Sequence, residues 1–219
     1  MKSARSATFV VAAIVTSATS CARVVGIDDA QLDPNLGTGG SGSISSLCSN
    51  YCDAVMANCQ DTYSQYASRD ACDGICGALE AQSLIGDPQH ADIGNSLSCR
   101  LQKASAAGTL GEKYLYCPAA GPGGNGTCGT NCEGYCYLMK QMCPIEFAKD
   151  PLQNSLDSCL SVCGGLGTVD GGFNASQQSG NTINCRLYHV SAAAAAAVSG
   201  LQNLSATHCT HAAGANPCN

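Results

Sequence analysis

Cysteines and apolar side chains recur at helical intervals in two parts of the chain. Cys48, Cys52 and Cys59 stand at i, i+4 and i+11, so a helix brings all three near one face. Tyr51 and Val55 lie beside them on that face. A second stripe with the same spacing contains Cys132, Tyr135, Cys136, Met139 and Cys143. The pattern predicts one amphipathic helix in each part, with its cysteines facing a common partner.

Two further helices are expected in each part. A second C-x3-C pair predicts a shorter helix that ends at Gly77 in the first part and at Gly164 in the second. A third, alanine-rich helix is expected from Cys99 to Tyr116 and again from Cys185 to Thr207. β-Branched and aromatic residues alternate over no long run, so strands are not expected. The sequence therefore predicts an all-α, disulfide-rich fold of two tandem repeats, with about three helices each and Gly/Asn-rich loops.

The two parts also match outside the cysteines. Residues 94–101 (GNSLSCRL) align with residues 180–187 (GNTINCRL), and a tyrosine precedes the second cysteine of each part. Agreement at this many positions is not expected by chance, and self-similarity of this kind indicates a repeat. We interpret the chain as a duplication, with one eight-cysteine repeat at 47–128 and the other at 129–219.

Disulfide bonds are the predicted role of the 16 repeat cysteines, out of 17 in the chain. Two antiparallel helices whose cysteines lie one turn apart can be joined twice, outer to outer and inner to inner. This geometry predicts four bonds: Cys48 to Cys76, Cys52 to Cys72, Cys132 to Cys163 and Cys136 to Cys159. Elimination alone assigns the other four: Cys59 to Cys99, Cys117 to Cys128, Cys143 to Cys185 and Cys209 to Cys218.

Residues 1–20 have the pattern of a secretory signal peptide, because Lys2 and Arg5 precede an apolar run and small residues precede Cys21. Residues 18–21 (ATSC) resemble a bacterial lipobox, in which the cysteine becomes lipidated after cleavage. Lipidation of Cys21 leaves an even number of cysteines, and residues 21–46 supply a Gly/Ser-rich tether. Ordinary signal peptidase would cut at the same bond, so plain secretion is the alternative.

Charge and motifs exclude several classes of function. Removal of the signal peptide leaves 8 basic against 16 acidic residues, so no nucleic-acid partner is expected. The chain has no G-x-S-x-G and no H-E-x-x-H motif, and no catalytic residue is predicted. The two G-x-G-x-x-G strings, which begin at Gly37 and Gly121, follow no predicted strand and open no predicted helix.

Histidine and cysteine are also the natural ligands of zinc. Zinc knuckles favour C-x2-C, which does not occur, so neither a metal nor a cofactor is predicted. Three of the histidines fall in the second repeat, namely His189, His208 and His211, where the first repeat has Lys103, Tyr116 and Ala119. His208 and His211 could share a helical face and bind a surface metal. We prefer the interpretation that they are solvated residues flanking Cys209.

The residues GIDD at 26–29, the Gly/Ser tether and the paired G-N-[ST]-x2-C-R-L motif resemble uncharacterised cysteine-rich lipoproteins predicted in myxobacteria, with a duplicated eight-cysteine repeat. The resemblance implies an outer-membrane or cell-surface location. It supplies no activity and no functional residues. Ala22, which follows Cys21, differs from the aspartate that retains lipoproteins in the inner membrane of enteric bacteria.

These features lead us to expect a non-enzymatic exported lipoprotein that serves as a surface or periplasmic binding or structural module. Its expected partners are the membrane, through the lipid anchor, and a protein or glycan at the cell surface. A soluble periplasmic or secreted location is the alternative to the anchored one. A redox or metal-linked periplasmic protein is the alternative function.

Overall fold

Hydroxyl side chains explain where most of the helices begin. In the computed structural model, the side-chain oxygen of a serine or threonine accepts a hydrogen bond from the backbone N–H three residues later. Six helices start in this way, behind Ser45, Ser68, Ser96, Thr130, Ser155 and Thr182. Each such cap satisfies a donor that the helix itself leaves unpaired and stabilises the fold by about 1 kcal/mol.

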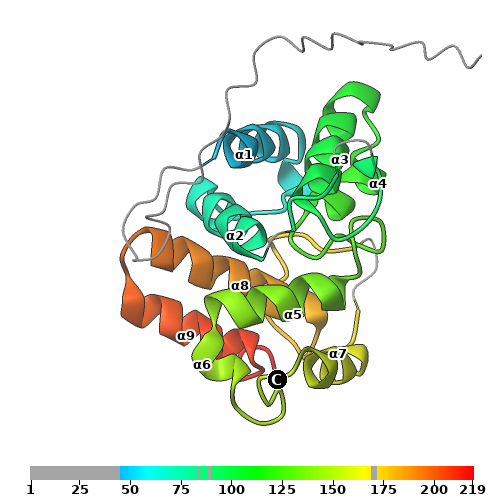
Figure 1. The fold of residues 1–219 in the computed structure, drawn as a ribbon. Coiled ribbons are helices and arrows are strands. Elements are labelled where there is room, and N and C mark those ends of the chain that lie inside the picture. Colours follow the sequence, from blue (N-terminus) through cyan, green and yellow to red (C-terminus); the bar gives the residue numbers. More distant parts are fainter. Residues whose placement is uncertain (1–44, 83, 88–89, 169–171) are drawn as a thin grey trace, which may run out of the picture. The chain divides into compact units, whose positions relative to one another are not determined.

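The structure describes residues 45–219 except 83, 88–89 and 169–171, and these residues belong to one compact unit. Their helices (Figure 1) are α1 (Ser46–Asn58), the 3-10 helix η1 (Asp61–Tyr63), α2 (Arg69–Ala81), α3 (Leu97–Leu110), α4 (Lys113–Ala120), α5 (Asn131–Met142), α6 (Pro144–Phe147), α7 (Leu156–Gly164), α8 (Ile183–Val198) and α9 (Gln202–Ala212). The described part of the chain has no strand, only an isolated bridge between Gly167 and Thr182. The predicted all-α, disulfide-rich fold is confirmed.

Several expected features lie outside the described residues. These are the signal peptide at 1–20, Cys21 and the tether as far as residue 44. Ser46, the last residue of the predicted tether, is the first residue of α1, and Ser45 caps this helix. Among residues 45–219, apart from the gaps given above, no helix has both the length and the apolarity needed to cross a bilayer.

The prediction of one long third helix in each part is wrong, because the structure forms two helices there. α3 ends before Gly111 and α8 ends before Gly200, and both glycines have a φ of 73°. A residue with a Cβ rarely adopts this left-handed conformation, so glycine permits the chain to reverse. α4 therefore packs back on α3, and α9 packs back on α8. Each half of the domain has four main helices instead of three.

We call residues 45–128 the first half and residues 129–219 the second half. The first half contains α1, α2, α3 and α4, and the second contains α5, α7, α8 and α9 with the short α6 between α5 and α7. α7 ends at Gly164 as predicted. α2 runs four residues past Gly77, which was the predicted end, because Ala78 and Leu79 are buried and extend its apolar face.

Double cross-links join the first two main helices of each half, as predicted. Cys48 bonds to Cys76 and Cys52 to Cys72 between α1 and α2. The bonds between α5 and α7 are Cys132 to Cys163 and Cys136 to Cys159. In all four the Cα atoms are 5.6–5.8 Å apart, which is the usual separation for a disulfide.

The four bonds assigned by elimination are wrong. The structure instead joins Cys59 to Cys117, Cys99 to Cys128, Cys143 to Cys209 and Cys185 to Cys218. The turns at Gly111 and Gly200 are the reason, since they return the last helix of each half toward the end of its first helix. The third cysteine then meets the seventh, and the sixth is left for the eighth. The order of pairing is the same in both halves.

Buried tyrosines occupy equivalent places in the two halves. Tyr51 and Tyr135 are both fully buried, and their hydroxyls donate to the carbonyl oxygens of Ala120 at 2.7 Å and Ala212 at 2.9 Å. Each acceptor stands three residues after the seventh cysteine of its half. These hydrogen bonds tie the first helix of each half to its last helix.

The halves meet where α8 packs against α2, and α8 also packs against α5 and α9 (Figure 1). The closest approach involves Gly74 of α2. A Cβ atom on Gly74 would lie 2.9 Å from both the Cβ and the carbonyl oxygen of Ala194. The small residues on both helices are therefore what permits them to lie so near each other.

Candidate functional site

A cavity of about 270 Å³ lies between α2 and the hairpin formed by α8 and α9. Its walls are mostly small or apolar, with Ala71 from α2, Ala192 and Ala195 from α8, Leu204 from α9 and Phe173 from the segment before α8. Alanine side chains leave space that larger residues would fill. The alanine run of α8 thus creates the cavity, and both halves contribute to its walls.

Polar side chains also line this cavity, namely Gln65, Tyr66, Ser68, Asp70, Tyr188, Ser191, Ser199 and His208. Asp70 accepts a hydrogen bond from the Ser199 hydroxyl at 3.1 Å on one side. Gln65 and His208 also line it, and Gln65 uses its amide nitrogen to donate to the carbonyl oxygens of Tyr63 and Phe173. An apolar recess with a few polar groups is the usual form of a binding pocket.

Two exposed apolar side chains lie at the mouth of the cavity, and a third stands close to them in the sequence. Leu201 and Leu204 line it and yet are 53% and 45% exposed, respectively. Val198, at the end of α8 and three residues before Leu201, is exposed as well. Together these three residues form what we call the apolar rim. Apolar groups gathered around a recess are typical of surfaces that bind partners.

Three histidines from the same hairpin converge beside this cavity. His189 comes from α8, and His208 and His211 come from one face of α9 because they are three residues apart. One ring nitrogen from each lies within 4.8 Å of the others. The Nδ1 atoms of His189 and His208 are only 3.0 Å apart, which is a hydrogen-bonding distance. We call these residues the histidine cluster.

Hydrogen bonds define which ring nitrogens of His189 and His208 carry a proton. The Nε2 atom of His189 lies 3.2 Å from the carbonyl oxygen of Gln178, and a carbonyl can only accept, so Nε2 carries the proton. The Nδ1 atom of His189 is then a lone-pair acceptor, and Nδ1 of His208 donates to it. The Nδ1 atom of His211 is buried and has no hydrogen-bond partner among the described residues.

Burial lowers the pKa of two of these histidines, His189 and His208. The pKa of His189 falls from 6.5 to about 4, first because of burial and then because of the two neighbouring imidazoles. The pKa of His208 is also lowered, by burial and then by His211. A neutral imidazole has a free nitrogen lone pair, which is the form that binds a metal ion.

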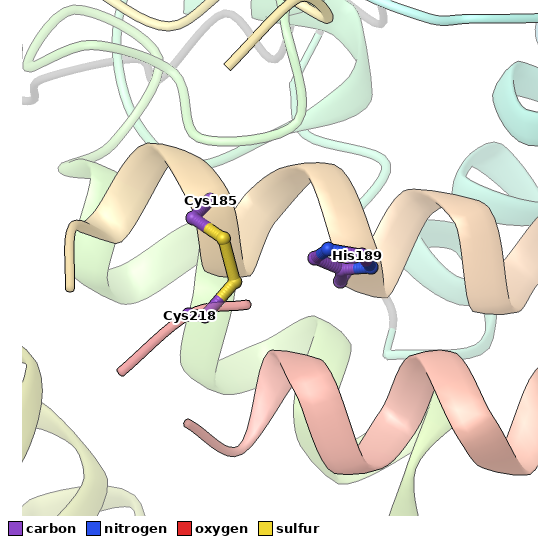
Figure 2. A group of neighbouring side chains, drawn as sticks. All are labelled: Cys185, His189 and Cys218. Atoms are coloured by element: carbon purple, nitrogen blue, oxygen red, sulfur yellow. A yellow bond between two sulfur atoms is a disulfide. The ribbon is translucent and has the colours of Figure 1, made fainter. Parts of the chain in front are cut away.

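A disulfide adjoins the cluster, as Figure 2 shows for Cys185, His189 and Cys218. Cys185 lies one turn before His189 on α8, and its sulfur is bonded to that of Cys218. All three side chains offer ligand atoms within 4.8 Å of one another. A metal binds thiolates and not a disulfide, so of these three residues only His189 is available as a ligand.

The other residues considered from the sequence do not assemble into a site. Gly121 follows α4 and begins a loop, so the second glycine string opens no helix. The first glycine string and Cys21 lie outside the described residues. All 16 repeat cysteines form disulfides.

The histidine cluster is the feature that sequence reasoning missed. His208 and His211 were interpreted as solvated, whereas the structure half-buries both against His189. The separation of 19 residues between His189 and His208 hides their contact. The available signal was indirect, since His189 stands four residues after the sixth cysteine and the other two flank the seventh.

No protein-family model matches this chain, and neither a curated protein nor a solved structure is significantly similar to it. Its function must therefore be argued from its own residues.

Proposed function

We propose that this protein is an exported, lipid-anchored and non-enzymatic binding module whose partner is a protein. The partner inserts an apolar side chain into the cavity between α2 and the α8–α9 hairpin. The observation that carries this proposal is the coincidence of the cavity with the apolar rim of Val198, Leu201 and Leu204. Interfaces obtain most of their energy from a few large side chains buried in such recesses.

Protein is favoured over glycan as the partner by the chemistry of the cavity. Six alanines, two leucines and Phe173 line it, and the leucines at its mouth are exposed. An apolar recess gains affinity from burying hydrocarbon and offers little to the hydroxyl groups of a sugar. An aromatic or leucine side chain matches the walls and the volume.

We also infer that the two halves are copies of one unit. Identical order of disulfide pairing, the equivalent tyrosine hydrogen bonds and the paired motifs at 94–101 and 180–187 all support a duplication. The disulfides suit an oxidising compartment outside the cytoplasm. They support export, and the resemblance to myxobacterial lipoproteins supports an outer-membrane or cell-surface location.

Peptide display tests the partner surface. We expect random peptides selected on the purified protein to share an aromatic or leucine anchor. Binding of these peptides should fall at least tenfold in the double variant Leu201→Asp/Leu204→Asp, because charges at the rim oppose burial of an apolar anchor.

The matched control is Leu110→Asp/Leu115→Asp, which alters exposed leucines at the equivalent turn between α3 and α4, where no residue lines the cavity. This control should bind the peptides as the parent protein does. Equal losses in both double variants would contradict the proposed surface. If the protein binds to a glycan array and the display selects no peptide, the proposed class of partner is contradicted.

Fractionation tests the anchor in a bacterial host that lipidates exported proteins. The protein should sediment with membranes and incorporate labelled palmitate, and Cys21→Ser should abolish both. If the protein with Cys21 intact is soluble and incorporates no palmitate, plain secretion is favoured.

A further inference from the structure

We propose that His189, His208 and His211 form a binding site for one divalent transition-metal ion, of which Zn²⁺ is the representative. Imidazole nitrogens suit zinc, copper and nickel, whereas magnesium and calcium prefer oxygen ligands. Three protein ligands would leave one position of a tetrahedral ion open to water or another small ligand. This inference does not depend on the partner proposed above.

The nitrogen spacing is close to that of a metal site. Two ligands that each lie 2.0–2.1 Å from a tetrahedral zinc ion are separated by about 3.3 Å. The Nδ1 atoms of His189 and His208 are 3.0 Å apart, and His211 brings its nitrogen within 4.8 Å of both. His211 is half-buried and at the edge of the cluster, so a side-chain rotation can close the remaining gap.

The partner of His189 orients it as a ligand. Metal-binding histidines usually donate their second ring N–H to a carbonyl or carboxylate, which fixes the tautomer and the plane of the ring. His189 makes this hydrogen bond to the carbonyl oxygen of Gln178. Its Nδ1 lone pair is consequently directed at His208 before any ion arrives.

An unsatisfied nitrogen points independently to a ligand. Buried polar atoms almost always have a hydrogen-bond partner, because leaving one unpaired costs about 1–3 kcal/mol. The Nδ1 atom of His211 is buried and has none among the described residues. A bound ion would satisfy this atom and replace the single proton shared by the other two rings.

Disulfides hold the helices that carry the ligands. Cys209, which lies between His208 and His211, is bonded to Cys143 at the end of α5. Cys185, one turn from His189, is bonded to Cys218. A site held rigidly before binding loses less conformational entropy on binding, which raises its affinity.

The first half provides an internal contrast. It has the same disulfides and hairpin, but Lys103, Tyr116 and Ala119 occupy the positions that correspond to the three histidines. None of these side chains is a zinc ligand in its ordinary protonation state. One ion per chain is therefore expected, and not two.

Zinc titration of the untagged, metal-stripped protein tests the inference, with calorimetry for affinity and elemental analysis for stoichiometry. We expect one Zn²⁺ per chain with a dissociation constant in the micromolar range or below. His208→Ala and His211→Ala should each weaken binding at least tenfold, and the double variant at least a hundredfold. Circular dichroism and an unchanged set of eight disulfides would show that the variants fold.

His90→Ala is the matched control, because His90 is the remaining histidine, is exposed and pairs with Asp87 outside the cluster. It should bind zinc as the parent protein does, and so should Leu201→Asp/Leu204→Asp. Mg²⁺ in excess should not displace zinc, and a thiol-alkylating reagent should not affect uptake. Unchanged affinity in the His208/His211 double variant, an equal loss in His90→Ala, or no stoichiometric uptake would overturn the site.

Discussion

The two halves of this domain have the same order of disulfide pairing and differ in the hydrogen bonds of one buried arginine. Arg100 and Arg186 stand at equivalent positions, one residue after the sixth cysteine. Arg100 is fully buried and donates to the carbonyl oxygens of Ser96, Gly121 and Pro122 and to the side chain of Asn95. Its environment offers an acceptor to each guanidinium nitrogen.

Arg186 has a poorer environment. It donates to Asn181 at 3.2 Å, as Arg100 does to Asn95, and also interacts with the hydroxyl of Tyr135. Its Nε atom is buried with no partner among the described residues. Buried side-chain atoms without a partner among the described residues occur in both halves. They are Gln65 Oε1 and Asn95 Nδ2 in the first half, and Arg186 Nε and His211 Nδ1 in the second. The halves therefore differ in the hydrogen bonding of this arginine and in the histidine cluster of the second half, not in their number of unsatisfied polar groups.

The largest effect is expected from removing the bond between the third and seventh cysteines. The variants Cys59→Ala/Cys117→Ala and Cys143→Ala/Cys209→Ala open loops with sequence separations of 58 and 66 residues. Each should lower the free energy of unfolding by about 4 kcal/mol, measured by denaturant titration, because the unfolded chain gains entropy.

Zinc binding distinguishes these two variants. Only the loss of Cys143 to Cys209 frees the helix that carries His208 and His211, so only that variant should also lose zinc affinity. Equal affinity in the two disulfide variants would mean that the framework does not orient the cluster.

A smaller effect is expected from replacing the buried arginines. Arg100→Met should cost about 3 kcal/mol, because it removes the guanidinium donor from the carbonyl oxygens of Gly121 and Pro122 and from the side chain of Asn95. Arg186→Met should cost about 1 kcal/mol, since fewer hydrogen bonds are lost and one unsatisfied nitrogen is removed. Thermal and denaturant unfolding measure both, and similar losses would contradict the proposed asymmetry.

The smallest effect is expected at the two buried tyrosines. Tyr51→Phe should cost about 1.5 kcal/mol and Tyr135→Phe about 1 kcal/mol, through the lost hydrogen bond to a backbone carbonyl. Tyr51 is the more costly because its hydroxyl also lies 2.7 Å from that of Tyr66. A larger loss at Tyr135 in denaturant unfolding would reverse this comparison.

Local spacing predicted much of the framework. The intervals between cysteines in α1 and α2, and in α5 and α7, repeat the helical turn, so matching cysteines face each other at the right distance. Their four disulfides could therefore be derived without a structure. Ser96 and Thr182 cap the helices that the sequence predicts from Cys99 and Cys185, although these helices begin two residues earlier.

The remaining disulfides were mispredicted because they depend on a change of direction. Gly111 and Gly200 each end a helix, yet helical periodicity continues on both sides of them and conceals the turn. Only when α4 and α9 fold back do Cys117 and Cys209 approach Cys59 and Cys143.

The sequence alone determined the helical class, the cysteine framework and the matching of its two parts, because these follow from intervals of a few residues. The tertiary structure alone decided the cavity, the full order of pairing and the histidine cluster. Each of these depends on where one helix meets another. Nothing in the local spacing of His189 indicates that α9 would bring His208 to within 3.0 Å of it.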